Sequence, residues 1–483
     1  MKKADIGLYG LAVMGENLVM NMESKGFTVS VSSRNTDKVR EFAQGRAKDH
    51  NIICTYSLQE LVDSIEKPRK IMMMIKAGQA VDDMIDKFIP FLEPGDVLID
   101  GGNSNFHDTI RRTAYVESKG LLYIGTGVSG GEEGALKGPS IMPGGSKEAW
   151  PLVKPIFQAI AAEVEGGEKC CDWIGNDGAG HFVKMVHNGI EYGDIQLICE
   201  SYHILRDVLK LSADEMHQVF SDWNKTELDS YLIEITADIL AVKDEDGKPL
   251  IDKILDTAGQ KGTGKWTGIT SMEEGVPLTL IGEAVYARCL SAMKEERVQA
   301  AKTYAPTPST FSKDKKAFIE DLRKALYAAK IISYAQGYTL MRTAAMTYNW
   351  DLNYGGIALL WRGGCIIRSV FLSKIKEAYD RDPALPNLLL DPYFVQTIEG
   401  LIDSWRRVVT TAVMNGVPTP ALSAGLNYFD GYKTEKLPAN LLQAQRDYFG
   451  AHTYERVDRP RGEFHHTNWT GRGGSTTSST YNA

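Results

Sequence analysis

A glycine-rich turn near the N-terminus constrains the fold of this chain more than any other feature. Gly10, Ala12 and Gly15 follow the apolar run Ile6–Tyr9 and open a helical pattern, after which a second strand-like run, Phe27–Ser32, begins. The turn has the Gly-x-Gly-x-x-Gly layout, with alanine at the second position. Such a turn brings the amides of a helix N-terminus close to a pyrophosphate. The order strand, turn, helix, strand predicts a Rossmann-type dinucleotide-binding domain, and an ordinary βα turn is the alternative.

The residues after the second run indicate which dinucleotide is bound. An NAD enzyme carries Asp or Glu here, to accept a hydrogen bond from the ribose 2′-hydroxyl. This chain has two small hydroxyls, Ser32 and Ser33, followed by the cation Arg34. Hydroxyls and a guanidinium suit a 2′-phosphate. We therefore predict NADP as the cofactor.

The pattern of the chain changes twice along its length. Over residues 1–177, short strand-like runs alternate with helical patterns, which predicts a mostly parallel sheet in an α/β domain. Over residues 178–434 long helical patterns dominate, and we expect a large all-α domain. Similar stretches that begin at Glu200 and Gln336 in two long helices indicate an internal duplication. Residues 435–483 are predicted to be an extended C-terminal tail. Its final Gly-, Ser- and Thr-rich part cannot build a core of its own, so it is either disordered or ordered by something else.

Composition excludes several classes of protein. The 483 residues carry a formal net charge of −8, which argues against a protein that coats nucleic acid or anionic membrane. The longest apolar run, Ile71–Ile75, is too short to span a bilayer. The six cysteines have neither metal-ligand spacing nor a disulfide framework, and the N-terminus lacks a signal peptide's apolar core. We expect a cytoplasmic protein without a metal site.

Four polar residues share one face of the first long helical pattern. Lys184, His187, Asn188 and Glu191 lie at positions i, i+3, i+4 and i+7, among apolar neighbours. A solvated face with an incidental lysine and glutamate is the alternative to a functional cleft. If the lysine is buried beside the positive nicotinamide ring, its pKa falls and it can accept a proton. Glu191, two turns further on, could then serve as a separate proton donor.

Three loops offer groups that bind anions. One, Asp100–Ser104, ends a strand, and a second, Val128–Glu132, offers backbone amides and a hydroxyl. The third, Gly259–Trp266, combines lysine, hydroxyl and glycine, but it lacks the glycine spacing of a P-loop. A phosphate on a small ligand is therefore more plausible there than a nucleotide phosphate.

With these residues assembled, the whole chain, through Tyr481-Asn482-Ala483, resembles the 6-phosphogluconate dehydrogenase (decarboxylating) family of the β-hydroxyacid dehydrogenase superfamily. The most specific match is the stretch Ile254–Trp266. The resemblance implies oxidative decarboxylation of 6-phosphogluconate to ribulose 5-phosphate and CO2 in the pentose phosphate pathway, with NADP as cofactor and no metal. It also implies a homodimer in which the C-terminal tail threads through the partner subunit.

The resemblance further implies a set of site residues. Lys184 and Glu191 are the implied catalytic pair. Cofactor contacts are implied at Gly10, Leu11, Ala12, Val13, Met14, Gly15, Ser33, Arg34, Asn35, Ile75, Lys76, Ala77 and Asn103. Substrate contacts are implied at Asn103, Ser129, Gly130, Gly131, His187, Asn188, Tyr192, Lys261, Thr263 and Arg288, and at Arg446 and His452, which would reach the neighbouring subunit's site. Family members commonly read Asn-Arg-Thr or Asn-Arg-Ser where this chain reads Ser33-Arg34-Asn35.

The mechanism we expect has three steps. Lys184 takes the proton of the C3 hydroxyl as hydride leaves C3, the resulting β-keto acid loses CO2, and Glu191 protonates C1 of the enediol. One alternative is an NADP-dependent β-hydroxyacid dehydrogenase that stops at the ketone. Another is a non-catalytic NADP-binding scaffold, which gives no reason for the Lys184–Glu191 face.

Overall fold

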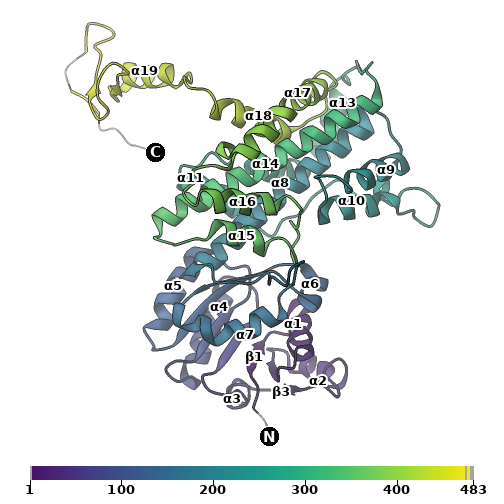
Figure 1. The fold of residues 1–483 in the computed structure, drawn as a ribbon, viewed down its shortest axis with the longest axis vertical. Coiled ribbons are helices and arrows are strands. Elements are labelled where there is room, and N and C mark those ends of the chain that lie inside the picture. The colour runs from purple at the N-terminus through teal and green to yellow at the C-terminus, as the bar shows by residue number, and fades with distance from the viewer. Residues whose placement is uncertain (1–2, 474–475, 479–483) are drawn as a thin grey trace. The chain divides into compact units, whose positions relative to one another are not determined.

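A computed structural model describes residues 3–473 and 476–478 of the chain (Figure 1). The chain divides into two compact units, Met1–Gly425 and Leu426–Ala483. The predicted boundaries after residues 177 and 434 remain predictions. Residues 474–475 and 479–483, which include the terminal Tyr481-Asn482-Ala483, lie outside the described residues.

The first part of the larger unit is built on one eight-stranded sheet, in the order β3-β2-β1-β4-β5-β6-β7-β8. Its neighbouring strands pair in parallel, except that β6 and β7 are antiparallel. This confirms the predicted α/β class and the mostly parallel sheet. The strands are β1 (Ile6–Tyr9), β2 (Val29–Ser32), β3 (Ile52–Cys54), β4 (Lys70–Met73), β5 (Val97–Asp100), β6 (Leu122–Val128), β7 (Ile141–Gly145) and β8 (Gly175–Asn176).

The central strands are mostly apolar and buried, because helices cover both faces of the sheet. Each face of the sheet has its own hydrophobic core, and alternate residues of β5 point into different ones. Val97 and Ile99 pack in the first core, and Leu98 packs in the second. Helices α1 and α7 contribute to the first core, and α3 and α4 to the second. The helices of this part are α1 (Val13–Ser24), α2 (Thr36–Gln44), α3 (Leu58–Asp63), α4 (Gln79–Phe88), α5 (Phe106–Glu117), α6 (Gly131–Lys137) and α7 (Trp150–Ile160).

Helices make up the second part of the larger unit, as predicted. Asn224 Oδ1 accepts a hydrogen bond from the amide of Ser230 at 3.1 Å and holds a turn, so the stretch 214–241 forms two helices rather than one. The helices are α8 (Ala179–Asp207), α9 (Ala213–Trp223), α10 (Tyr231–Ala241), α11 (Thr263–Glu273), α12 (Thr279–Ser291), α13 (Lys294–Thr303), α14 (Lys315–Thr347), α15 (Tyr354–Leu360), α16 (Leu372–Arg381) and α17 (Pro392–Met414). The next helix, α18 (Pro420–Tyr432), runs across the boundary between the two units.

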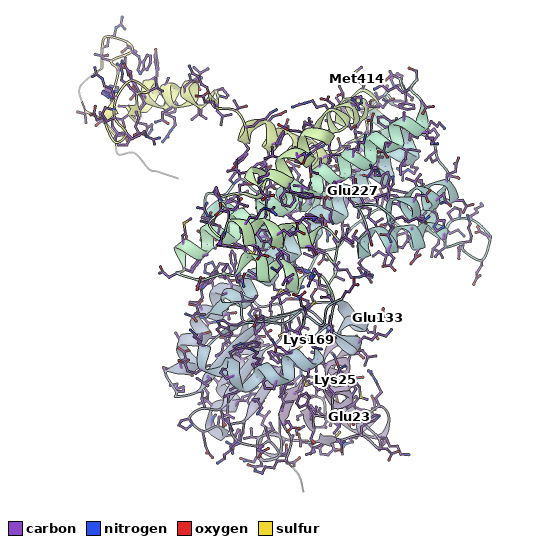
Figure 2. The ribbon with its side chains drawn as sticks, viewed as in Figure 1. Glu23, Lys25, Glu133, Lys169, Glu227 and Met414 are labelled. Carbon is purple, nitrogen blue, oxygen red and sulfur yellow. The ribbon has the colours of Figure 1, made fainter. Side chains whose placement is uncertain are left out.

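Helix α8 links the sheet to the helical part, and this position sets the environment of the predicted reaction site. It packs against β6 and β7 and also against α11, α12 and α14 (Figure 1). Every residue from Ala179 to Ile190 is consequently buried. Glu133, which is labelled in Figure 2, pairs with Lys137 on the surface, and an exposed pair of this kind contributes little to stability.

The smaller unit holds α19 (Ala439–Gly450) and a two-stranded hairpin of β9 (Tyr454–Glu455) and β10 (Phe464–His465). Among its described residues beyond 432, the buried ones are Asp447 and Thr453. The Asp447 carboxylate accepts hydrogen bonds from the amides of Thr453 and Thr467, each at 3.0 Å. His466 Nδ1 donates to the same carboxylate at 2.9 Å and Trp469 Nε1 at 2.8 Å. A buried carboxylate, rather than an apolar core, organises this unit.

Candidate active site

The glycine-rich turn has the geometry that a pyrophosphate needs. Gly10 has φ of +114°, and a Cβ at this position would overlap the carbonyl oxygen of Met74. Helix α1 begins directly afterwards, and its N-cap, Ala12, makes no side-chain hydrogen bond to the first amides. These amides are therefore free to bind an anion. The turn fits a dinucleotide, as the sequence predicted.

The loop after β2 presents a free cation. Arg34 is exposed and makes no hydrogen bond or ion pair with the other residues that the structure describes. Asn35 has a structural task, since its side chain accepts from the Asp37 amide at 3.0 Å and caps α2. An unpaired guanidinium beside the ribose end of the turn suits a 2′-phosphate.

A buried arginine, which the sequence analysis missed, ties two cofactor-side loops together. Arg112 NH2 donates to the carbonyl oxygen of Gly78 at 2.9 Å, in the loop that carries Lys76 and Ala77. Arg112 NH1 lies 3.7 Å from the fully buried carboxylate of Asp100. Asp100 in turn accepts from the Gly102 amide at 3.0 Å, which shapes the turn at whose tip Asn103 is exposed.

The Lys184 side chain is almost completely buried among the elements that pack around α8. It is 5% exposed, and its stem lies so close to β6 that a Cβ on Gly127 would be 2.6 Å from its Cγ. Burial lowers the pKa of Lys184, and the negative charge of Glu191 opposes this only in part. A lysine with a lowered pKa is more readily neutral and can accept a proton. The solvated-face alternative is therefore wrong.

The other residues of the predicted polar face lie around this lysine. Lys184 Nζ is 3.4 Å from His187 Nδ1, and His187 Nε2 is 3.5 Å from Ser129 Oγ. His187 Nδ1 also lies 3.1 Å from Asn188 Oδ1. Burial, followed by the charge of Lys184, lowers the pKa of His187 and keeps it neutral. Burial raises the pKa of Glu191, and the charges of Lys184 and Arg288 oppose this rise only in part. The pKa shifts of Lys184 and Glu191 are therefore opposite: the lysine is shifted toward a neutral base and the glutamic acid toward a proton donor.

A small cavity of about 10 Å³ lies beside Lys184, lined from the loop after β5, from α8 and from α11. Four predicted site residues line it: Asn103, Lys184, Asn188 and Thr263. The other lining residues, which were not predicted as site residues, are His181, Met185, Ser104 and Trp266. Helical spacing could have indicated His181, which precedes Lys184 by three positions.

Tyr192 and Arg288 form a second cluster near Glu191. The Arg288 guanidinium carbon lies 3.5 Å from the centroid of the Tyr192 ring, a cation–π contact that fixes both side chains. Lys261 is exposed at the end of the loop before α11. In the smaller unit, Arg446 NH1 donates to Gln443 Oε1 at 3.1 Å, and His452 lies in the same unit.

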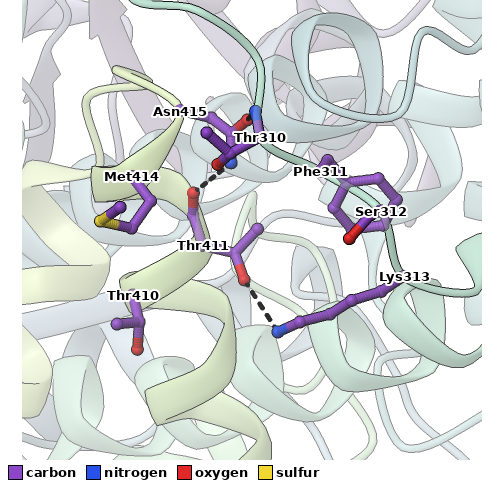
Figure 3. A pocket seen from close by; sticks show the side chains of 8 residues that line it. All are labelled: Thr310, Phe311, Ser312, Lys313, Thr410, Thr411, Met414 and Asn415. Carbon is purple, nitrogen blue, oxygen red and sulfur yellow. Dashed lines mark hydrogen bonds between the residues drawn. The ribbon is translucent and has the colours of Figure 1, made fainter.

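Another hollow, of about 190 Å³, lies where residues 310–313 meet the end of α17 (Figure 3). Its polar groups bond one another: Asn415 Oδ1 accepts from the Thr310 amide at 2.8 Å, and Lys313 Nζ donates to Thr411 Oγ1 at 3.4 Å. None of the predicted site residues lines it, and we assign it no chemistry.

Comparison with known proteins agrees with this geometry. Residues 5–175 match the NAD binding domain of 6-phosphogluconate dehydrogenase, and residues 180–469 match the C-terminal domain of the same enzyme. The chain belongs to the 6-phosphogluconate dehydrogenase family. It is 61% identical to the decarboxylating 6-phosphogluconate dehydrogenase of Homo sapiens over 484 residues, which cover 100% of both chains. It is equally 61% identical to the enzyme of Haemophilus ducreyi over 479 residues, 99% of each chain.

A solved structure of this family has the same fold. The 6-phosphogluconate dehydrogenase of Plasmodium falciparum superposes with a TM-score of 0.93 at 45% identity, covering 96% of this chain and 100% of that one. That protein was studied in its apo form, with its cofactor NADP+ and with its substrate 6-phosphogluconate.

The described residues contain neither a membrane-spanning helix nor a metal-binding cluster. None of the described helices is long and apolar enough to cross a membrane. No group of three or more His, Cys, Asp or Glu side chains in the described ranges is placed to hold a metal ion.

Proposed function

We propose that this chain oxidises and decarboxylates 6-phosphogluconate to ribulose 5-phosphate and CO2, with NADP as the oxidant. The observation that carries the proposal is the pair of the buried Lys184 and the partly buried Glu191 on one face of α8. The two pKa values are shifted toward a neutral base and a protonated acid. Lys184 shares its cavity with Asn103 of the cofactor-side loop.

The chain's own residues divide the reaction between them. Bound NADP supplies a hydride acceptor, held by the amides that follow Gly10 and by Arg34. Neutral Lys184 takes the proton of the C3 hydroxyl as C3 is oxidised to a ketone. The Lys184 ammonium that results donates to the new carbonyl oxygen. This draws the electrons of the breaking C1–C2 bond toward that oxygen as CO2 leaves.

Glu191 completes the sequence as a proton donor. It gives its proton to the carbon that has lost CO2, which becomes C1 of ribulose 5-phosphate. Burial raises the pKa of Glu191 above its ordinary value, which favours the protonated form that a donor needs. His187 and Asn188 hold the lysine and the substrate in place, since the His187 ring contacts both Lys184 and Ser129.

The remaining predicted contacts account for a phosphorylated substrate. Lys261 and Arg288 are cations that can bind the phosphate, and we propose Arg446 and His452 as contacts to the site of a partner subunit in a homodimer. A cytoplasmic location is also proposed. It is supported by the six cysteines, all of which are free thiols.

Substrate specificity tests the proposed function. NADPH formation should be rapid with 6-phosphogluconate and NADP, and at least about tenfold slower with gluconate, because a missing charged hydrogen bond to the phosphate costs about 1.5–3 kcal/mol. Equal rates with the two sugar acids would overturn the assignment of the substrate.

A further inference from the structure

One buried nitrogen in the active-site cavity has no hydrogen-bond partner within residues 3–473 and 476–478. His181 lies on α8, one turn before Lys184, and is 1% exposed. Its ring lines the cavity together with Asn103 and Lys184. Nδ1 lies 2.7 Å from Thr109 Oγ1, whereas Nε2 has no hydrogen-bond partner among the residues that the structure describes.

The orientation of the ring is fixed by its neighbours. A Cβ on Gly125 of β6 would lie 2.8 Å from Nδ1 and 3.0 Å from Cε1, so the ring packs directly on the strand. The Thr109 hydroxyl, which also bonds the carbonyl oxygen of Asn105 at 3.2 Å, holds Nδ1 from the other side. The ring therefore cannot turn to satisfy Nε2 elsewhere.

Burial also decides the charge of this ring. It lowers the pKa of His181, and the nearby Asp100 carboxylate and the Gly102 carbonyl oppose this only in part. A neutral imidazole can make one hydrogen bond through each nitrogen. A buried polar atom left without a bond costs stability, and such atoms in native proteins commonly serve a ligand.

We propose that Nε2 of His181 hydrogen-bonds a bound ligand beside Asn103 and so helps to position the reacting groups over Lys184. The inference rests on the proposed function. Because the Thr109 hydroxyl donates to Asn105, its oxygen accepts from Nδ1–H, and Nε2 of the neutral ring is left as an acceptor. The bonded group is therefore a hydrogen-bond donor, either the amide of the nicotinamide carboxamide or a hydroxyl of the sugar acid. Neither His181 nor Thr109 belongs to the set of residues that the family resemblance implied.

Two substitutions separate the two nitrogens of the ring. The amide of asparagine falls near the position of Nδ1, so His181→Asn keeps the bond to Thr109 and loses the ligand bond. The amide of glutamine reaches the position of Nε2, so His181→Gln keeps the ligand bond. His203→Asn, on the same helix, is the control, since His203 pairs with Asp207 near the other end of α8.

The measurements are NADPH binding by fluorescence titration, KM and kcat for 6-phosphogluconate, and thermal unfolding. We expect His181→Asn to weaken one ligand by about 3- to 10-fold, the usual effect of removing one hydrogen bond. His181→Gln should recover most of this loss. A change confined to NADPH binding identifies the cofactor as the source of the group, and a change confined to KM identifies the sugar acid.

Two results would overturn the proposal. The first is that NADPH and 6-phosphogluconate both bind His181→Asn within twofold of wild type. The second is that His181→Asn and His181→Gln are equally impaired and show the same fall in Tm, which would mean a purely structural role. If the wild type itself formed no NADPH from 6-phosphogluconate, the proposed function would fail. The titration with NADPH would still test His181.

Discussion

Replacing Gly127 by alanine tests whether the placement of Lys184 limits the reaction. Gly127 lies in β6, and the added Cβ would lie 2.6 Å from Cγ of Lys184 and closer still to its Cβ. Carbon atoms in ordinary contact are about 3.5–4.0 Å apart, so the lysine stem or the strand must move by about 1 Å. A displacement of this size at a reacting group costs about 100-fold in rate. We expect kcat to fall by about that factor.

The same substitution should lower stability, because an extra methyl group in a packed interior costs about 1–3 kcal/mol. NADPH formation gives kcat, and urea unfolding gives the free energy of unfolding. Gly268→Ala in α11 is the matched control, because a Cβ there meets nothing within 4 Å, and its kcat should stay within twofold of wild type. If Gly127→Ala kept full kcat and unfolded at the same urea concentration as wild type, the reasoning would be refuted.

Four further predictions concern the base, the acid, the cofactor loop and the smaller unit. Lys184→Met should abolish oxidation, while Glu191→Ala should mainly slow the later proton transfer; single-turnover release of NADPH and product separates the steps, and normal turnover without the lysine would exclude it as the base. Because the charge of Glu191 raises the pKa of Lys184, Glu191→Gln should lower that pKa and move the acid limb of kcat/KM to lower pH, whereas a shift to higher pH would contradict the pairing. Arg34→Glu should weaken NADP binding but not NAD binding in titrations, and an unchanged preference would remove Arg34 from this role. Asp447→Asn should speed hydrogen exchange at the Thr453 amide, which donates to this carboxylate; unchanged protection would show that the carboxylate does not organise the unit.

The sequence predicted the strands and turns that are determined by residues adjacent to one another in the chain. The strand Ile6–Tyr9 has its predicted bounds because it is apolar on both faces and is followed by Gly10, whose positive φ ends the strand in a turn. The strands β3 and β8 were not predicted, since they have three and two residues and carry almost no periodic signal. The strand β7 contains Pro143 and two glycines, which sequence patterns assign to loops.

The candidate site was predictable where one helix carries it. The spacing of Lys184, His187 and Glu191 placed them together, but their burial comes from β6 and from helices far along the chain, which no local pattern contains. Arg112 illustrates the same limit. In the sequence it is one of two adjacent arginines on a helix, and only the fold brings it to Asp100 and Gly78.

The ratio of CO2 to NADPH tests the central claim most directly, namely that the site around Lys184 and Glu191 both oxidises and decarboxylates its substrate. The wild-type protein is supplied with 6-phosphogluconate and NADP without added divalent metal, and both products are followed in the same sample. The account predicts that they appear together in equal amounts. NADPH without CO2 would mean that the reaction stops at the ketone, and the absence of both products would contradict the enzymatic assignment.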